Sequence, residues 1–252
     1  MVVKAKKPCA NPKIASRCFP SYHHTMHLSI TPLKPSAIPS DEEVMKAADA
    51  LLETTASWKE GKTFHKQVKT YSHPKGPDDG AAWHSRVSVH KPEEATFAQM
   101  WAKLGEDKAV NEAKFIPNIK KVTKVKEISA TQNIWTLYYT LHVSMTRPLV
   151  AGAQKLGLNP QITQSPPRTI VSIPVDLTED ESLAKLEEKG VRGRYVSVER
   201  ILELEDGNIE WSMATSSTPG GSIPTYFVER SMASQIAEVS EFRCPSFNVD
   251  SP

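Results

Sequence analysis

The sequence has few cysteines, no long apolar run and almost no net charge. Its three cysteines, Cys9, Cys18 and Cys244, lie near the ends of the chain, so no disulfide framework is expected and a reducing compartment, the cytoplasm, fits best. No apolar run approaches the ~18 residues that a membrane-spanning helix needs. Lysine and arginine (31 residues) nearly balance aspartate and glutamate (29 residues), so the charge gives no reason to expect nucleic-acid binding.

Common catalytic and cofactor motifs are also missing. The chain contains no G-x-S-x-G, H-E-x-x-H, G-x-G-x-x-G or Walker sequence, and no cofactor is expected. His23, His24 and His27 have near-helical metal spacing, but they lie in a proline-rich segment without a nearby cysteine or acid. Such a segment makes a poor preorganised site, so no metal is expected.

The first 39 residues differ from the rest of the chain, because no acidic residue precedes Asp41. A mitochondrial presequence is also basic and poor in acids, but it must form an amphipathic helix, which the repeated prolines here interrupt. We therefore interpret residues 1–39 as a flexible basic arm, with a transit peptide as the alternative. Residues 40–240 have the length of one domain, and residues 241–252 are interpreted as a tail.

Local signals predict a mixed α+β domain with a mainly antiparallel sheet. Ser40 and Glu43 form a capping-box pattern that starts a helix, and residues 133–144 read as a strand. Residues 147–167 read as a helix or a long loop.

The last third of the chain is the most informative part. It reads as a strand over residues 192–204, an Asp-Gly turn over residues 205–208, a return strand over residues 209–217 and a helix over residues 224–239. A long antiparallel hairpin followed by one C-terminal helix is how a helix-grip fold ends. In that fold a curved sheet wraps a long helix and leaves an internal hydrophobic cavity.

Strand alternation sorts the side chains into two faces, and the more apolar set is predicted to face the interior. The predicted interior set includes Trp83, Ser85, Trp135, Tyr139, Arg194, Arg200, Trp211, Met213 and Thr215. The alternate residues of the first of these strands, His84, Arg86, Ser88 and His90, are predicted to face outward. A one-residue bulge would exchange the two sets.

Two charged features have alternative interpretations. A buried Arg200 needs a partner, which would be Glu229 on the last helix, solvent or an anionic ligand. A strip of lysines is either a solvated edge strand or a docking surface for an acidic carrier protein; it comprises Lys114, Lys120, Lys121, Lys124 and Lys126.

Five segments carry a family resemblance. They are W-H-S-R-V-S-V-H (83–90), F-I-P-N-I-K-K-V (115–122), I-V-S-I-P-V-D-L (170–177), G-V-R-G-R-Y-V-S-V-E-R (190–200) and M-A-T-S-S-T-P-G-G-S-I-P (213–224). Over about residues 40–239 the chain resembles a fungal START-like family long classed as a domain of unknown function, related to the Bet v 1 and polyketide cyclase superfamily. The resemblance implies a START-like helix-grip fold with a ligand cavity. The end of the chain, Cys244-Pro245-Ser246, departs from the family pattern, so one cavity wall would be shorter or a homodimer partner would complete it.

Some members of that family accompany fungal polyketide synthases and close a polyketide to a pyrone ring. The resemblance therefore implies a polyketide cyclase, which would meet its substrate free or on a synthase carrier domain. Arg200, or Arg86 if the register is flipped, would stabilise the oxyanion, and Tyr139 or a nearby histidine would move the proton. Trp83, Ser85, Trp135, Arg194, Trp211, Met213 and Thr215 would line the substrate site.

Two other functions fit the same sequence. The first is a noncatalytic carrier of a lipid, sterol or other hydrophobic ligand in the same cavity. The second is an interaction module built around the lysine strip, for which the cavity would be irrelevant.

Overall fold

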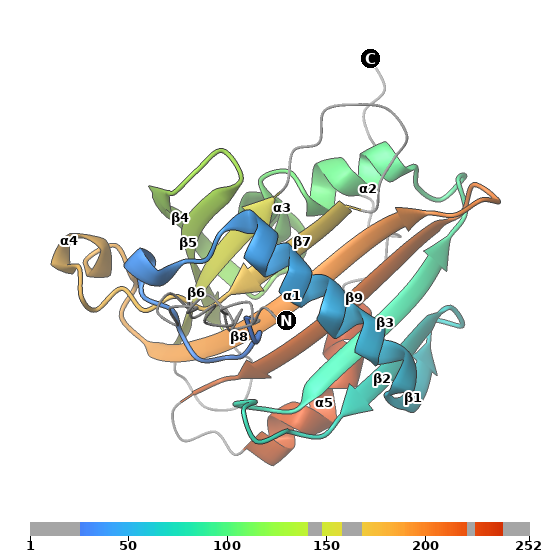
Figure 1. Ribbon diagram of the computed structural model, residues 1–252, viewed down its shortest axis with the longest axis horizontal. Helices are drawn as coiled ribbons and strands as arrows, with labels where there is room; N and C mark the ends of the chain where they lie inside the picture. The colour runs from blue at the N-terminus through green and yellow to red at the C-terminus, as the bar shows by residue number, and fades with distance from the viewer. Residues whose placement is uncertain (1–25, 141–147, 158–167, 221–224, 239–252) are drawn as a thin grey trace, which may run out of the picture.

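One nine-stranded sheet organises the chain in the computed structural model, which describes residues 26–140, 148–157, 168–220 and 225–238 (Figure 1). The strands are β1 (Lys59–Phe64), β2 (Val68–His73), β3 (Trp83–His90), β4 (Ile119–Glu127), β5 (Gln132–Thr140), β6 (Pro148–Gly157), β7 (Arg168–Ile173), β8 (Val191–Glu203) and β9 (Ile209–Thr218). Their order across the sheet is β1-β2-β3-β9-β8-β7-β6-β5-β4. Neighbours in this order are antiparallel, and β6 makes an additional short parallel pairing with β8.

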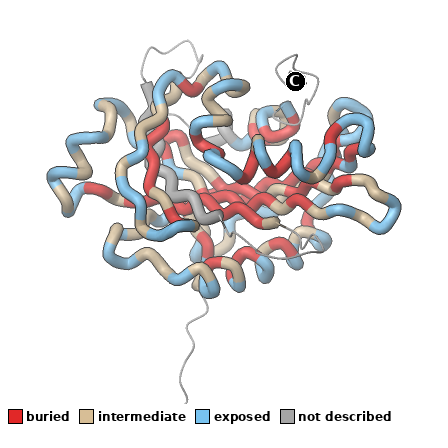
Figure 2. The backbone as a smooth tube through the Cα atoms, turned by 90° about the horizontal axis from the view of Figure 1, so that it is seen from above, coloured by how far each residue is buried: buried red, intermediate tan, exposed pale blue. Residues whose placement is uncertain are grey.

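Helices lie on both sides of the sheet, which forms the buried middle layer in Figure 2. They are α1 (Asp41–Thr54), α2 (Phe97–Leu104), α3 (Lys108–Phe115), α4 (Glu181–Ala184) and α5 (Thr225–Glu238), with short 3₁₀ turns η1 (Pro35–Ala37) and η2 (Thr55–Ser57). Helix α1 crosses the front of the sheet in Figure 1, and α5 lies behind it. No helix in the described ranges is long and apolar enough to span a bilayer.

The start of α1 confirms its sequence signal. Ser40 Oγ accepts from the backbone N–H of Glu43 at 3.3 Å, and the Glu43 carboxylate accepts from the backbone N–H of Ser40 at 3.0 Å. This reciprocal capping box satisfies two N–H groups that the first helical turn would otherwise leave without partners. The helix then buries one apolar stripe, comprising Val44, Ala47, Ala48 and Leu52.

The predicted hairpin is confirmed, but its loop differs by one residue from the expected turn. Glu203 pairs with Ile209, so five residues separate the last paired positions. The Gly207 N–H donates to the Leu204 carbonyl at 2.9 Å, and Gly207 has φ +80°, which only glycine adopts without strain. The Leu204 N–H also donates to the Asn208 carbonyl at 2.8 Å, so the loop itself is residues 205–207, a three-residue hairpin loop with a left-handed glycine bulge.

The structure of residues 148–157 and of residues 26–39 differs from what the sequence predicts. Residues 148–157 form strand β6 between β5 and β7, so the prediction of a helix or long loop there is wrong. Residues 26–39 pack on the sheet layer, with Leu28 and Ile30 buried beside α1. The division of the chain at residues 39 and 240 remains a prediction, and His23, His24 and the three cysteines lie outside the described residues.

Candidate functional site

The two faces of the sheet are covered by different helices. In antiparallel sheets, directly paired residues project to the same face. Trp83, Val198 and Ala214 lie on the face that packs on α1, which we call the α1 face. Trp211 and Ile201 lie on the opposite face with α2, and α5 contacts β3 from this side, so we call it the α5 face.

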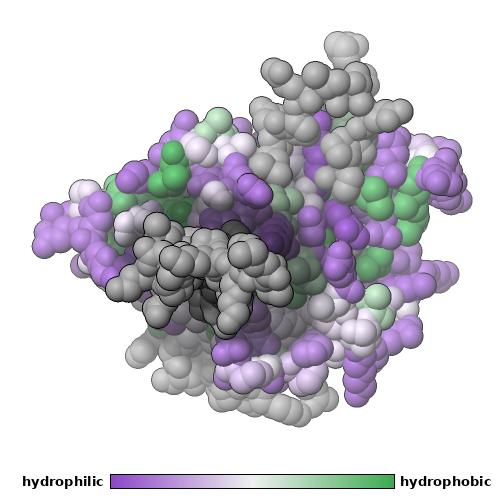
Figure 3. All heavy atoms as spheres, viewed as in Figure 1, coloured by the Kyte–Doolittle hydropathy of each residue, from purple (hydrophilic) through white to green (hydrophobic). Residues whose placement is uncertain are grey.

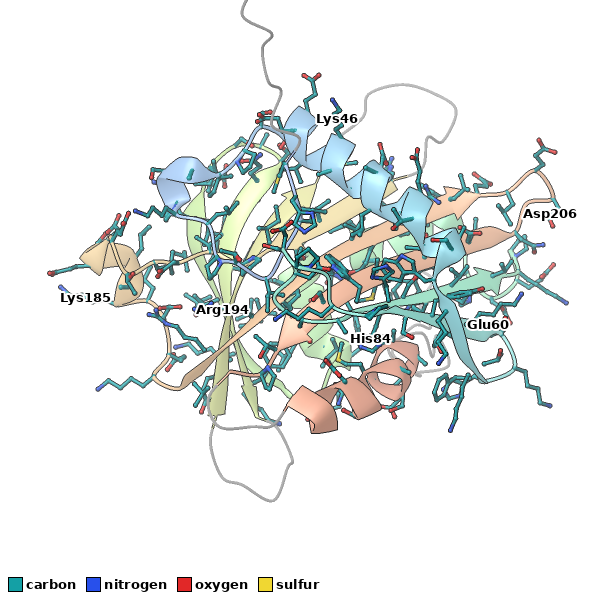
Figure 4. The ribbon with its side chains drawn as sticks, turned by 60° about the horizontal axis from the view of Figure 1, so that its bottom comes forward. Lys46, Glu60, His84, Lys185, Arg194 and Asp206 are labelled. Carbon is teal, nitrogen blue, oxygen red and sulfur yellow. The ribbon has the colours of Figure 1, made fainter. Side chains whose placement is uncertain are left out.

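The α5 face of β3 carries a line of buried polar side chains. His84, Arg86, Ser88 and His90 alternate along the strand, and their exposed fractions are 8%, 0%, 1% and 1%. Their partners on β9 are Thr215, Met213, Trp211 and Ile209. Figure 4 shows His84 beside helix α5, which places this polar line between the sheet and the helix layer.

Arg86 is the charged member of this line and is completely buried. Its Cζ lies 3.4 Å from the centre of the Trp211 ring, a cation–π contact. Its Nη1 donates to Ser88 Oγ at 3.3 Å, whereas Nε and Nη2 have no hydrogen-bond partner. Burial lowers the pKa of Arg86 to about 10, opposed by the charge of Glu199, so the guanidinium stays charged at neutral pH.

Ser88 connects Arg86 to His90. Ser88 Oγ lies 2.8 Å from His90 Nε2, and His90 Nδ1 lies 3.7 Å from the Glu94 carboxylate. Ser88, which accepts from Arg86, can donate its own proton to a neutral His90 at Nε2, and the imidazole then carries its proton on Nδ1, on the side of Glu94. This relay resembles the arrangement of a hydroxyl, a base and an orienting acid.

Burial keeps both histidines of the line neutral near pH 7. It lowers the pKa of His84, with Glu229 opposing the shift. It also lowers the pKa of His90, where Glu94 opposes and Arg86 adds to the shift. A neutral imidazole can accept a proton, whereas an imidazolium cannot.

A second charged group lies on the same face, where α3 packs on β8. Lys108 Nζ contacts Glu112 Oε1 at 2.6 Å and Glu199 Oε1 at 2.7 Å, and Lys108 and Glu199 are 5% and 3% exposed. Burial alone would lower the pKa of Lys108, but the two carboxylates outweigh it and raise the pKa. Glu199 pairs with Met213 of β9, which in turn pairs with Arg86, so the two charged groups lie two strands apart.

Six of the residues predicted for the site share the α5 face, but they form two groups. Arg86, Trp211, Met213 and Thr215 lie on adjacent strands β3 and β9. Trp135 and Tyr139 lie on β5, which β9, β8, β7 and β6 separate from β3, and they pack with α3. Burial, Tyr195 and Glu112 raise the pKa of Tyr139 well above its usual value, so this phenol is a proton donor rather than a base.

The other predicted site residues lie on the opposite face, so the prediction that they share one interior with Trp211 is wrong. Trp83 and Ser85 of β3 project to the α1 face, as do Arg194 and Arg200 of β8. The expected four-residue turn pairs Leu204 with Ile209, whereas the five-residue separation pairs Glu203 with Ile209 and exchanges the faces of β8.

Of the three alternatives for Arg200, the ion pair with Glu229 is wrong. Among the described residues these two form no ion pair, because Arg200 projects to the α1 face and Glu229 belongs to α5 on the other side. Arg200 is half-buried and Arg194 is exposed, so neither arginine is enclosed in the way that Arg86 is.

Sequence reasoning missed Ser88, His90, Lys108 and Glu199 as interior residues. The first two were predicted to face outward, because alternation identifies an interior face only when the other face meets water. Here helices cover both faces, so the residues of β3 that were predicted to face outward are buried as well. The repeated spacing of Arg86, Ser88 and His90 was the available signal that these three residues act together.

The lysine strip is partly neutralised by neighbouring carboxylates. Lys121 is paired with Glu188, and Lys124 Nζ lies 2.6 Å from Glu127. A surface pocket of about 460 Å³ lies between this strip and the segment after α4; it is lined by Lys121, Thr123, Tyr138, Lys185, Leu186, Glu187, Glu188 and Lys189. Hydrophilic side chains also dominate the surface that carries α1, where the hydrophobic ones form small separate groups (Figure 3).

Residues 83–242, more than half of the chain, match the model of a family described as a protein of unknown function (DUF3074). The chain belongs to this family. No curated protein matches it in sequence. The matched region of this DUF3074 chain begins at Trp83 and contains the polar line of β3 and the whole closing hairpin.

Solved structures identify the fold of this DUF3074 chain as START-like. Human STARD10 has a TM-score of 0.64 at 10% identity, over 81% of this chain and 78% of that one. Human StAR-related lipid transfer protein 5 has a TM-score of 0.60 at 13% identity, over 81% of this chain and 97% of that one. The lipid transfer and protein localization domain of human StarD13 has a TM-score of 0.56 at 12% identity, over 82% and 100%. The predicted α+β helix-grip class is therefore confirmed.

Proposed function

We propose that the protein binds a hydrophobic ligand between the α5 face of its sheet and helix α5, and acts as a carrier. The fold supports this proposal, because two of the structurally similar proteins are named for lipid transfer. The layer between sheet and helix also supplies apolar surface. Trp211 and Ile209 are buried on the same face of the sheet, where α2 packs, and Met232 and Ile236 are buried on α5.

The observation that carries the proposal is the buried polar line of β3. A buried polar group without a partner costs free energy, because folding removes it from water and returns nothing. Arg86 Nε and Nη2 and His84 Nε2 are buried and without partners on the face that α5 covers. Polar donors in an otherwise apolar layer are typical of ligand sites, where a few such groups orient the ligand.

The test is to purify the chain and record native mass spectra, followed by organic extraction and lipid identification. A carrier is expected to retain a hydrophobic molecule at near-stoichiometric occupancy, or to gain thermal stability when lipids or sterols are added. A chain that is empty as purified and whose melting temperature no lipid or sterol changes would contradict the carrier proposal.

A second candidate is the polyketide cyclase, and the relay of Arg86, Ser88 and His90 favours it. Neutral His90, acting through Ser88, would take the proton of a substrate enol. The enol oxygen would then attack the terminal thioester carbonyl, and Arg86 would stabilise the oxyanion. Collapse of that intermediate breaks the C–S bond, the thiol leaves with the proton from His90, and a lactone ring remains.

Co-expression with a polyketide synthase that makes a linear polyene tests this candidate. Product profiles are compared for the wild type, Arg86→Met and Arg200→Met. A cyclase is expected to yield a pyrone with the wild type and with Arg200→Met, and at least tenfold less with Arg86→Met. Unchanged products, combined with a retained lipid, would leave the carrier function alone.

A further inference from the structure

The free edge of Arg86 has a shape that indicates its ligand. Nε–H and Nη2–H lie on the same edge of the planar guanidinium and point in parallel, and these are the two donors without partners. Two parallel N–H groups match the two oxygens of a carboxylate, which accepts both at once. A single hydroxyl or ketone oxygen satisfies one of them well and leaves the other poorly paired.

No described side chain already fills this edge. Arg86 forms no ion pair with a described carboxylate. Glu199 influences the pKa of Arg86 only through the electrostatic field of its charge. Its Oε1 forms an ion pair with Lys108 Nζ at 2.7 Å. Ser88 meets Nη1, on the other side of the guanidinium, and Trp211 covers its plane.

The charges around Arg86 also limit the ligand. Of the polar residues beside it on β3, His84 and His90 are held neutral by burial, so the guanidinium is the one cation of this line. One cation balances one negative charge, whereas a phosphate dianion would leave a second charge buried without compensation.

We propose that Arg86 binds the carboxylate of an acidic amphiphile, and that the apolar chain of this ligand lies along Trp211 and Met213 toward α5. This inference rests on the proposed hydrophobic-ligand function and specifies its ligand class. The carboxylate could belong to a saturated fatty acid or to a conjugated polyene acid, and these two sources differ in the stiffness of the chain. Arg86 is then a specificity residue, because it selects the acid over the alcohol of the same chain.

The test uses three C18 probes that differ at one feature each. Stearate is the saturated acid, octadecanol is its neutral analogue, and parinaric acid is a conjugated polyene acid whose fluorescence reports binding. Affinities of the full chain are measured by fluorescence for parinaric acid and by its displacement for the other two. Hydrogen bonds to charged groups predict that an acid binds about 10- to 100-fold more tightly than octadecanol.

Variants locate this preference at Arg86. Arg86→Met fills the same space without the charge and is expected to weaken acid binding about 10- to 100-fold, with octadecanol unchanged. Arg86→Lys keeps the charge without the paired donors and is expected to fall between the two. Arg200→Met, on the α1 face, is the matched control and is expected to bind as the wild type does. Circular dichroism confirms folding, and the wild-type comparison of acid and alcohol needs no variant.

Each outcome is decisive. Preference for stearate or parinaric acid that Arg86→Met removes supports the inference, and the better of the two acids identifies the source. Equal binding of acid and alcohol, or acid binding that Arg86→Met leaves intact, overturns the inference but leaves a hydrophobic-ligand carrier. Binding of none of the three overturns the inference, and the proposed function also fails if extraction finds no ligand.

Discussion

The two faces of the central strands differ in the polarity of the side chains that they bury. On the α1 face, Val171, Val196, Val198 and Ala214 are each completely buried and pack against the apolar stripe of α1. On the α5 face, β3 buries Arg86, Ser88 and His90, and β8 buries Glu199. Apolar burial stabilises a fold, whereas buried polar groups contribute little or cost stability unless every partner is present. The α1 face therefore contributes apolar packing on these strands, whereas the α5 face combines an apolar cluster with the polar site that we propose for ligand binding.

The largest effect is expected from damage to the α1 face. Trp83→Ala removes a 3%-exposed indole that packs with Trp58 and the α1 cluster. We expect the free energy of unfolding to fall by about 3–5 kcal/mol, which urea denaturation measures. Ligand binding per folded molecule should be unchanged. A decrease in the free energy of unfolding of less than about 1 kcal/mol would contradict the stabilising role of the α1 face.

The next effect is expected from the buried ion pair on the α5 face. Lys108→Met leaves Glu199 buried without its cation and should lower the free energy of unfolding by about 3 kcal/mol. Adding Glu199→Met removes the stranded charge, so the double variant should recover most of this loss. A double variant as unstable as the single one would show that Lys108 acts through packing rather than charge.

A smaller effect of opposite sign is expected at Arg86. Arg86→Met should raise the free energy of unfolding of the ligand-free protein by about 1 kcal/mol, because it removes unpaired buried donors at the cost of one cation–π contact. Binding and stability would then change in opposite directions, as at sites where function opposes stability. A clear loss of stability would mean that the guanidinium supports the fold.

The smallest effect is expected from acid. Burial lowers the pKa values of His84 and His90 in the folded protein, so as the pH falls through about 6.5 the unfolded chain binds more protons than the folded one. The free energy of unfolding should therefore fall as the pH drops from 7 to 5. His84→Gln and His90→Gln should each flatten this slope in urea titrations, and a slope that both variants retain would assign it to other groups.

Much of the fold was predictable because its signals are local. A capping box starts α1, an Asp-Gly turn joins β8 and β9, and the helix after β9 completes the helix-grip order. Strand β6 was not predictable, because Gly152 and Gly157 weaken its propensity and its pairing with β5 and β7 provides the support.

The site was predictable only in part, because the face on which a residue lies depends on the loop length between the strands and on the packing of the helices. Trp211, Met213 and Thr215 were placed on the face that the structure gives them, and Arg86 was named as the alternative cation. Arg200 and Arg194 were placed on the wrong face, because the loop around Gly207 has an odd number of residues instead of the expected four, which reverses the whole of β8. Which face carries α5 depends on tertiary packing, which alternation does not report.

Arg86, Ser88 and His90 occupy alternate positions of one strand, and β3 is held on both edges by β2 and β9. Five consecutive residues therefore contain three of the four members of the polar line, Arg86, Ser88 and His90, and the loops that join the strands contribute no member to it. During evolution the loops could change to accept larger or smaller ligands while the polar side chains of β3 that we propose for ligand binding stay the same. Protein engineering could equally substitute residues 86–90 to change ligand selectivity without changing the loops.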